Sequence, residues 1–166
     1  RVLSLEPNTL PDVLRTISVV GEATRRESEA AAVVASLQAR IDRVRETMAA
    51  VAEGPRVFCM EWTDPLWVAG HWVPEMVALA GGQDVLGQAG APSVRVAWAQ
   101  VQAAAPEVIV LMPCGYDLAR TLEDRPIVET LPGWSDLPAV GLAYLHAESL
   151  LTPPGPWVRT PDLAAR

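Results

Sequence analysis

Large aromatic side chains cluster directly after the apolar run 56–60, where three tryptophans fall within eleven residues. An indole ring has two apolar faces and one polar N–H edge, so a group of them suits a broad ligand that is apolar in its middle and polar at its rim. The alternative is that these rings only cover the core of a chain that contains a single Phe. We expect a ligand-contacting loop that includes Trp62, Asp64, Pro65, Trp67, His71 and Trp72.

A second short segment follows the apolar run 107–112 and contains Cys114, Gly115 and Tyr116. In open α/β sheets, ligands bind outside the carboxyl ends of the strands. Because both segments follow strand-like runs, the sequence predicts that both of them contribute to a ligand site.

Groups suited to catalysis are few. Cys59 and Cys114 both fall at predicted strand ends and can be neighbours, but a cysteine nucleophile needs a base beside it, and the sequence does not identify one. Glu61 and Asp64 lie three residues apart, a spacing of carboxylates that is common by chance. Phosphate-binding, dinucleotide-binding, hydrolase and zinc motifs are absent from the sequence. We therefore expect no catalytic residues.

The two histidines, His71 and His146, are isolated in the sequence. A metal site needs further ligands at helical or hairpin spacing, and neither histidine has them. We expect no metal site built from protein residues, while His71 is a candidate axial ligand to the metal of a bound macrocycle.

The composition narrows the class of protein. The 166 residues include 13 Arg and no Lys, against 20 Asp and Glu, for a net charge of −7. An acidic chain without a cluster of Arg is a poor partner for phosphates, which excludes nucleic acid as the expected partner. The length suits one domain with a sizeable core, and the longest apolar runs are too short to span a bilayer.

The beginning of the chain predicts a strand and a short helix. Residues 1–5 alternate between apolar and polar side chains like a strand. Asn8 or Thr9 then offers a cap for a helix that extends through Val20, and Gly21 ends that helix.

A longer helix is predicted over residues 28–52. Its apolar positions step by three or four residues, which predicts a narrow seam packed against one neighbour. These positions are Val34, Leu37, Ile41, Val44, Met48 and Val51.

After residue 54 the pattern changes to short apolar strands that alternate with helices. Strands are predicted at 56–60, 107–112 and 142–145, and helices at 74–80, 98–104, 117–123 and 157–165. This alternation implies a mostly parallel sheet covered by helices on both faces. The predicted fold is α/β, with a three-layer lobe over 54–166 that follows a strand, a short helix and a long helix over 1–53.

Three stretches of the chain are similar to a known family. They are 1–14, 61–87 with its Gly81-Gly82 pair, and 96–121, in which Trp98 opens a helix and Pro106 and Glu107 precede an apolar strand. On these residues, the chain resembles the C-terminal part of class III substrate-binding proteins of ABC importers, in the cobalamin (vitamin B12)-binding branch. The resemblance extends over essentially all of the chain, and its second and third stretches are the more specific ones.

The resemblance implies two Rossmann-like lobes joined by one long connecting helix, with a corrinoid bound in the cleft between them. The helix over 28–52 then matches the connecting helix, and 54–166 the C-terminal ligand-binding lobe. Trp98 matches an aromatic residue that lies against the corrin, and the loop around Pro65 and Trp67 a second contact. An N-terminal lobe is absent from this sequence, so the resemblance implies either a fragment or a half-protein that pairs with a partner chain or dimerises.

The expected function is non-catalytic capture of cobalamin, as a ligand and not a cofactor, for delivery to an ABC permease. The resemblance implies a periplasmic location or one tethered to the outer face of the membrane. Two alternatives keep a small-molecule ligand: a haem or iron–siderophore binder of the same fold, and a cytoplasmic cobalamin-handling enzyme that uses His71, Cys59 or Cys114. A third is an interaction module whose tryptophans dock another protein.

Overall fold

Strand β1 is the centre of the sheet and pairs with three other strands. The structure is a computed structural model that describes residues 2–51, 53–138 and 141–144. The sheet has the order β4-β2-β1-β5-β6, with β3 beside the start of β1; β2 and β4 are antiparallel to their neighbours, and the other pairs are parallel. The strands are β1 (Arg56–Thr63), β2 (Leu66–Val68), β3 (Gln83–Asp84), β4 (Val94–Arg95), β5 (Val108–Leu111) and β6 (Gly141–Tyr144).

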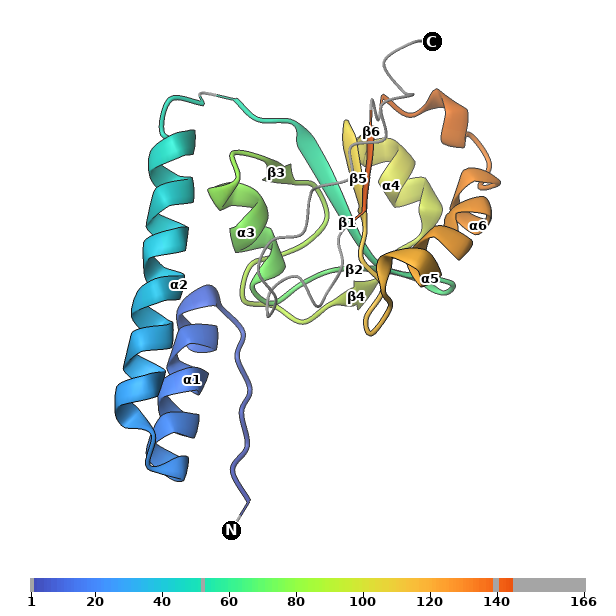
Figure 1. The fold of residues 1–166 in the computed structure, drawn as a ribbon. Helices are drawn as coiled ribbons and strands as arrows, with labels where there is room; N and C mark the ends of the chain where they lie inside the picture. The colour runs from blue at the N-terminus through green and yellow to red at the C-terminus, as the bar shows by residue number, and fades with distance from the viewer. Residues whose placement is uncertain (1, 52, 139–140, 145–166) are drawn as a thin grey trace.

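Helices cover both faces of this sheet (Figure 1). They are α3 (Val73–Leu79), α4 (Trp98–Ala104), α5 (Leu118–Glu123), α6 (Arg125–Glu129) and the short 3-10 helix η1 (Trp134–Asp136). Alternate residues of a strand point to opposite faces, so Phe58 and Met60 pack towards α4 and α6, whereas Val57 and Cys59 pack towards α3. The predicted three-layer α/β fold with a mostly parallel sheet is confirmed.

Most predicted elements of this lobe are found in the structure. The predicted strands at 56–60, 107–112 and 142–145 correspond to β1, β5 and β6, and the helices at 74–80, 98–104 and 117–123 to α3, α4 and α5. The sequence analysis missed β2, β3 and β4, of which the longest has three residues, as well as α6 and η1. The predicted helix at 157–165 and His146 lie outside the described residues.

The N-terminal segment differs from its prediction. Residues 2–8 form no strand, so the strand predicted at 1–5 is wrong. A strand needs a neighbour to satisfy its backbone donors and acceptors, and none of the described strands lies beside this segment. The predicted helix cap is confirmed at Thr9, whose side-chain oxygen accepts a hydrogen bond from the Asp12 N–H.

Helices α1 (Leu10–Thr24) and α2 (Glu27–Met48) pack together as a hairpin beside the lobe. Gly21 lies inside α1, so the prediction that it ends the helix is wrong; the helix ends instead at Thr24, capped by Arg25 in the left-handed conformation with φ 59°. A β-carbon at Gly21 would lie 2.4 Å from the Ala30 Cβ. The glycine is therefore the residue that allows the two helices to approach closely.

The apolar seam of α2 is only partly covered. Val34, Leu37, Ile41 and Met48 are half-buried against α1 and α3, whereas Val44 is 43% exposed. The helix ends at Met48, four residues before its predicted end. Among the described residues, no helix combines the length and the hydropathy that a membrane crossing requires.

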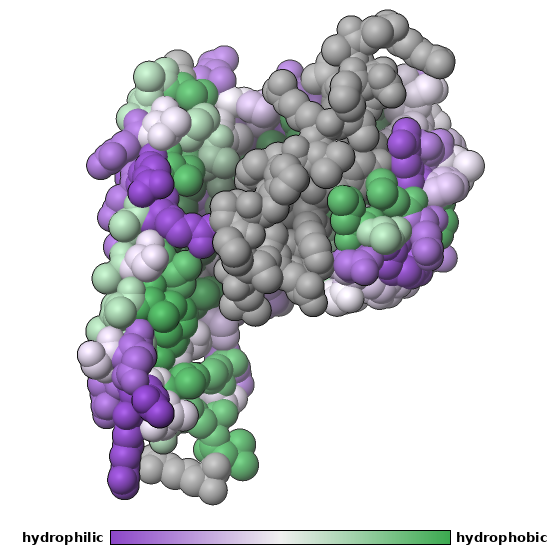
Figure 2. Space-filling view, viewed as in Figure 1, coloured by the Kyte–Doolittle hydropathy of each residue, from purple (hydrophilic) through white to green (hydrophobic). Residues whose placement is uncertain are grey.

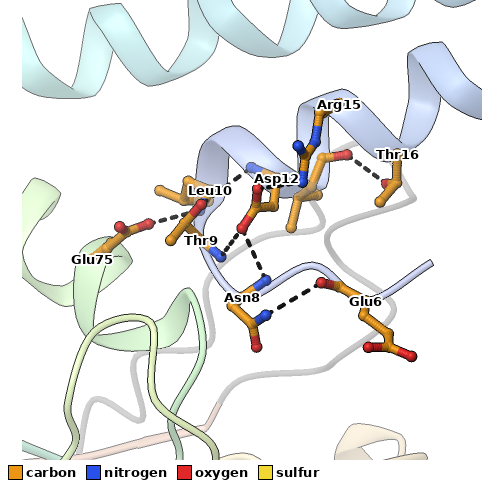
Figure 3. A network of polar contacts seen from close by, with 9 residues as sticks. Glu6, Asn8, Thr9, Leu10, Asp12, Arg15, Thr16 and Glu75 are labelled. Carbon is orange, nitrogen blue, oxygen red and sulfur yellow. Dashed lines mark hydrogen bonds and ion pairs between the residues drawn. The ribbon is translucent and has the colours of Figure 1, made fainter.

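A small polar network ties the helix hairpin to the lobe (Figure 3). The Asp12 carboxylate accepts the backbone N–H groups of Asn8 and Thr9 at 3.2 and 3.1 Å. Glu75 of α3 accepts the N–H of Leu10, the first residue of α1, at 2.6 Å. Because the first N–H groups of a helix have no partner inside the helix, a carboxylate from the lobe both caps α1 and sets its position.

Hydrophobic residues remain exposed along this hairpin and on the segment before it. Figure 2 shows them gathered on the face that also carries the N-terminal segment. The exposed apolar residues of these parts are Val2, Leu3, Leu5, Val20, Val33 and Val44, and Val51 is exposed just after the end of α2. An apolar surface of this kind is typical of a contact with a further protein surface.

Asp84, at the end of β3, is a half-buried carboxyl group of the lobe. Its Oδ1 accepts the N–H groups of Leu86 and Gly87 at 3.1 and 2.6 Å, but its buried Oδ2 has no hydrogen-bond partner among the described residues. Burial raises the pKa of this carboxyl, and the two backbone hydrogen bonds oppose that rise. Burial, and secondly the charge of Asp84, raise the pKa of the Cys59 thiol to about 12.

We expect Gly21→Ala to destabilise the protein, although alanine is favoured over glycine in a helix by about 1 kcal/mol. The added methyl group overlaps Ala30, and overpacking of this kind costs roughly 1–3 kcal/mol. Urea denaturation should show a lower free energy of unfolding for Gly21→Ala and near wild-type stability for Gly21→Ala with Ala30→Gly. A single variant as stable as the wild type would contradict the close helix contact.

The raised pKa of Asp84 gives its contribution to stability a definite sign. The carboxyl favours the folded state below its unfolded pKa near 3.8, and this contribution is lost as the pH rises through the higher folded pKa. Asp84→Asn keeps the oxygen that accepts the two N–H groups and removes the buried charge. We expect its stability to exceed that of the wild type at pH 7 and the difference to shrink at pH 4. The exposed Glu53→Gln is the control; an unchanged difference between the two pH values would refute the assignment.

Candidate functional site

The tryptophan-rich segment is a β-hairpin over its first half. β1 continues through Thr63, Asp64 and Pro65 form the turn with a cis peptide bond between them, and β2 returns along β1. Trp62 and Trp67 lie directly opposite each other in this pair, which places their side chains on the same face. The prediction of a loop is wrong here because two short strands pair before the chain leaves the sheet.

The two indole rings border a shallow, open depression of about 350 Å³. Its lining combines the hairpin with the segment that follows β5, because β1 and β5 are parallel neighbours whose carboxyl ends meet at one edge. The lining residues are Glu61, Trp62, Pro65, Trp67 and Cys114. The structure thus brings together the two segments that the sequence analysis selected.

The Tyr116 ring packs against the Trp62 ring, which lines the depression. Its ring centroid lies 5.3 Å from that of Trp62, with an angle of 54° between the ring planes. Gly115 has a φ of 77°, a conformation that favours glycine, and the position of its missing side chain faces open space. The Trp62 N–H donates to the backbone oxygen of Asp64 at 3.0 Å, so the ring is held at its polar edge as well.

Cys114 carries an exposed thiol whose only hydrogen-bond partner among the described residues is a carboxylate. Its Sγ lies 3.4 Å from Glu61 Oε1. Burial, followed by the charge and hydrogen bond of Glu61, raises the pKa of this thiol. A nucleophilic cysteine needs the opposite shift. Cys59 is a free thiol buried on the α3 side of the sheet, so the structure contains no bond between the two cysteines.

Three predicted site residues lie elsewhere in the structure. His71 and Trp72 precede α3, with ring centroids 5.9 Å apart, and the His71 backbone bonds to Gly90 and Ala91. Trp98 stacks on Trp134 at 5.9 Å. The N–H of Trp98 donates to the Pro132 oxygen at 2.7 Å. None of the three lines the depression, and their role in binding stays a prediction.

Three residues around the depression were not among the predicted ligand-binding residues, although the sequence analysis considered Glu61 as part of a carboxylate pair. Glu61 lines the depression, and Arg120 and Asp124 form an ion pair of 2.6 Å behind Tyr116. The spacing of Tyr116, Arg120 and Asp124 by four residues each was a signal for this group, since residues four apart come close on a helix. Only Arg120 lies within α5, and the other two flank it. Within the described part of the chain, no group of three or more His, Cys, Asp or Glu side chains is arranged to hold a metal ion.

The model of the family described as periplasmic binding protein matches residues 2–141. No curated protein matches the sequence. Among solved structures, the chain is similar to the haem complex of IsdE from S. aureus, with a TM-score of 0.74 and 16% identity over 89% of this chain and 59% of that one.

Two further structures share the fold. The vitamin B12-binding protein BtuF of Vibrio cholerae has a TM-score of 0.66 and 18% identity, covering 88% of this chain and 56% of its own. A protein of an Fe3+-hydroxamate transport system from Saccharomonospora viridis has a TM-score of 0.69 and 24% identity, covering 90% and 51%. The chain therefore spans little more than half the length of the structures that it matches.

Thiol labelling tests the arrangement of the two cysteines. We expect a disulfide reagent at pH 8 to modify Cys114 in the folded protein and to reach Cys59 only after unfolding. Glu61→Gln should accelerate labelling of Cys114 several-fold, because loss of the carboxylate lowers the pKa of the thiol and increases its thiolate fraction. Asp64→Asn, which removes a carboxylate of the same hairpin, is the control. Equal labelling rates for the wild type and Glu61→Gln would show that the Glu61 contact does not govern Cys114.

Proposed function

Because the chain belongs to the periplasmic binding protein family, we propose that it is a ligand-binding lobe of a substrate-binding protein that serves an ABC importer, with a corrinoid of the cobalamin class as its ligand. The observation that carries this proposal is the apolar depression bordered by Trp62 and Trp67 at the carboxyl edge of the sheet. Capture involves no chemical step on the ligand.

The shape of the depression supports a large, flat ligand. Two indole rings on one face of a hairpin, with Pro65 beside them, form a broad apolar surface. A pocket for a small molecule ordinarily surrounds most of its ligand, whereas this depression is shallow and open. A macrocycle fits such a surface with one of its faces and leaves the other face for a second surface.

We propose that a second protein surface contacts the other face of the ligand. The chain covers 51–59% of the three matched structures, so a further lobe, a partner chain or a second copy of this chain completes the cleft. The exposed apolar residues along the α1–α2 hairpin support a contact of this kind (Figure 2). In this arrangement α2 is the connecting helix between the halves.

Charge at the rim favours a corrinoid over an anionic ligand. Glu61 lines the depression and Asp64 is exposed beside it. Of the two neighbouring arginines, Arg120 pairs with Asp124, and Arg95 of β4 lies opposite Trp67, so the two carboxylates outnumber the one arginine on the Trp67 side. Carboxylates accept hydrogen bonds from the amide groups around a corrin ring and repel the carboxylates of a porphyrin.

Haem is the second candidate ligand, because a flat indole surface accepts a porphyrin as well and one of the matched structures holds haem. Only the shared fold supports an iron–hydroxamate as the ligand. An enzymatic role is less well supported, since the Cys114 thiol is held by a carboxylate that raises its pKa.

In keeping with its family, we propose that the protein acts outside the cytoplasm.

Titration of the purified chain with cyanocobalamin, haemin and an iron–hydroxamate tests the proposal. We expect saturable quenching of tryptophan fluorescence by cyanocobalamin and weaker binding of the other two. Trp62→Ala and Trp67→Ala should each weaken cobalamin binding at least about tenfold, or 1.4 kcal/mol, because each removes one side of the surface. Trp134→Phe, remote from the depression, is the matched control.

The outcome of this titration distinguishes the candidate ligands and functions. Failure of folded protein to bind cobalamin in equilibrium dialysis would overturn the corrinoid assignment, and preference for haemin would replace it with the second candidate. Binding that survives Trp62→Ala but is lost in Trp98→Phe would move the ligand to the Trp98 side of the lobe. Stable capture of another protein without competition by any ligand would support an interaction module.

A further inference from the structure

We propose that Arg120 is a positioning residue of the ligand site: anchored by the buried Asp124, it fixes the Tyr116 ring against Trp62 and so sets the orientation of the indole before a ligand arrives. This inference deepens the proposed function and rests on it. Arg120, Asp124 and Tyr116 do not line the depression themselves, whereas Trp62 does.

Asp124 is the fixed point of the arrangement. Its side chain is 9% exposed, and both carboxylate oxygens are used: Oδ1 accepts from Arg120 Nη1 at 2.6 Å and Oδ2 accepts from Thr63 Oγ1 at 3.1 Å. Thr63 follows Trp62 at the end of β1. The carboxylate therefore links the junction of α5 and α6 to the hairpin that carries the indole rings, and a buried charge with complete partners is a rigid support.

Arg120 connects Asp124 to the aromatic rings, because it contacts Tyr116 as well. Its Nη2 donates to the Tyr116 hydroxyl at 3.1 Å, and its guanidinium carbon lies 4.3 Å from the centroid of the same ring. The Tyr116 ring in turn contacts that of Trp62 at 5.3 Å. A cation against an aromatic face and a pair of tilted aromatic rings are both attractive contacts. Tyr116 follows Gly115 in a turn, so these side-chain contacts determine where its ring lies.

The same contacts keep the charge of Arg120 away from a ligand. Asp124 and Glu123, at 2.6 and 3.5 Å, both neutralise the guanidinium. Arg120 contacts Tyr116, and Tyr116 contacts Trp62. Of these three residues, only Trp62 lines the depression. The arginine thus acts on binding through ring orientation. Holding a side chain in its bound orientation beforehand removes an ordering cost that association otherwise carries.

The test is a double-variant cycle read first without ligand. The probe is the near-ultraviolet circular dichroism that Trp62 contributes, obtained as the difference between each variant and the same variant with Trp62→Phe. We expect Arg120→Met to reduce this signal as far as Tyr116→Ala does, and the two changes together to reduce it no further. Arg45→Met, which breaks an exposed ion pair of α2, should leave it unchanged.

Cyanocobalamin binding gives the second readout. Arg120→Met is expected to weaken binding about three- to tenfold, the size that the ordering cost implies. In the Tyr116→Ala background, the same change should have little further effect. Arg120→Lys, which retains a cation without the planar fork, should recover part of the loss. Additive effects of Arg120→Met and Tyr116→Ala, or wild-type affinity in Arg120→Met, would overturn the inference.

The design separates this inference from the proposed function. If the wild type does not bind cobalamin, the proposed function fails, while the ligand-free cycle still tests whether Arg120 positions the rings. If the wild type binds and the cycle is additive, only the positioning role fails. Should Arg120→Met not fold, Asp124→Asn answers the same question, because it frees the guanidinium from its anchor; an unchanged Trp62 signal there would also overturn the inference.

Discussion

The parallel pairing of β1 with β5 is the constraint on which the candidate site depends. Met60 pairs with Leu111 in this register, so both strands reach the same edge of the sheet, and the segments that follow them meet there. The pairing is held by side chains that are fully buried on the α4 and α6 side, among them Phe58, Ile109 and Leu111. Residues about fifty positions apart in the chain, Glu61 and Cys114, contact each other for this reason.

The β-hairpin at the end of β1 determines how the two tryptophans of the site are presented. The chain turns at Asp64 and Pro65 and returns as β2, so Trp62 and Trp67 are presented by paired strands. Strands hold side chains more firmly than free loops do. The Asp124–Arg120–Tyr116 contacts behind this hairpin add a second support. An apolar surface that is rigid and open on one side is suited to holding a flat ligand against an opposing surface.

Within the described residues, few contacts join the α1–α2 hairpin to the lobe. Glu75 caps the start of α1, and Met48, near the end of α2, approaches Gly81 at the end of α3. These contacts lie at the two ends of α3, so they define the orientation of the hairpin relative to the described part of the lobe. This arrangement suits a helix that links two bodies, and the exposed apolar residues on the hairpin agree with it.

The alternation of apolar runs with helical periodicity was enough to predict the α/β class, the central strands and most of the lobe helices, because burial on both faces leaves a strong local pattern. The sequence also selected the two segments that form the depression. It did not show the Trp62–Trp67 pairing, the place of Gly21 inside α1 or the packing of Trp98 on Trp134. Strand register and helix approach depend on residues distant in the chain, and only the tertiary structure decides which rings face a ligand and which face each other.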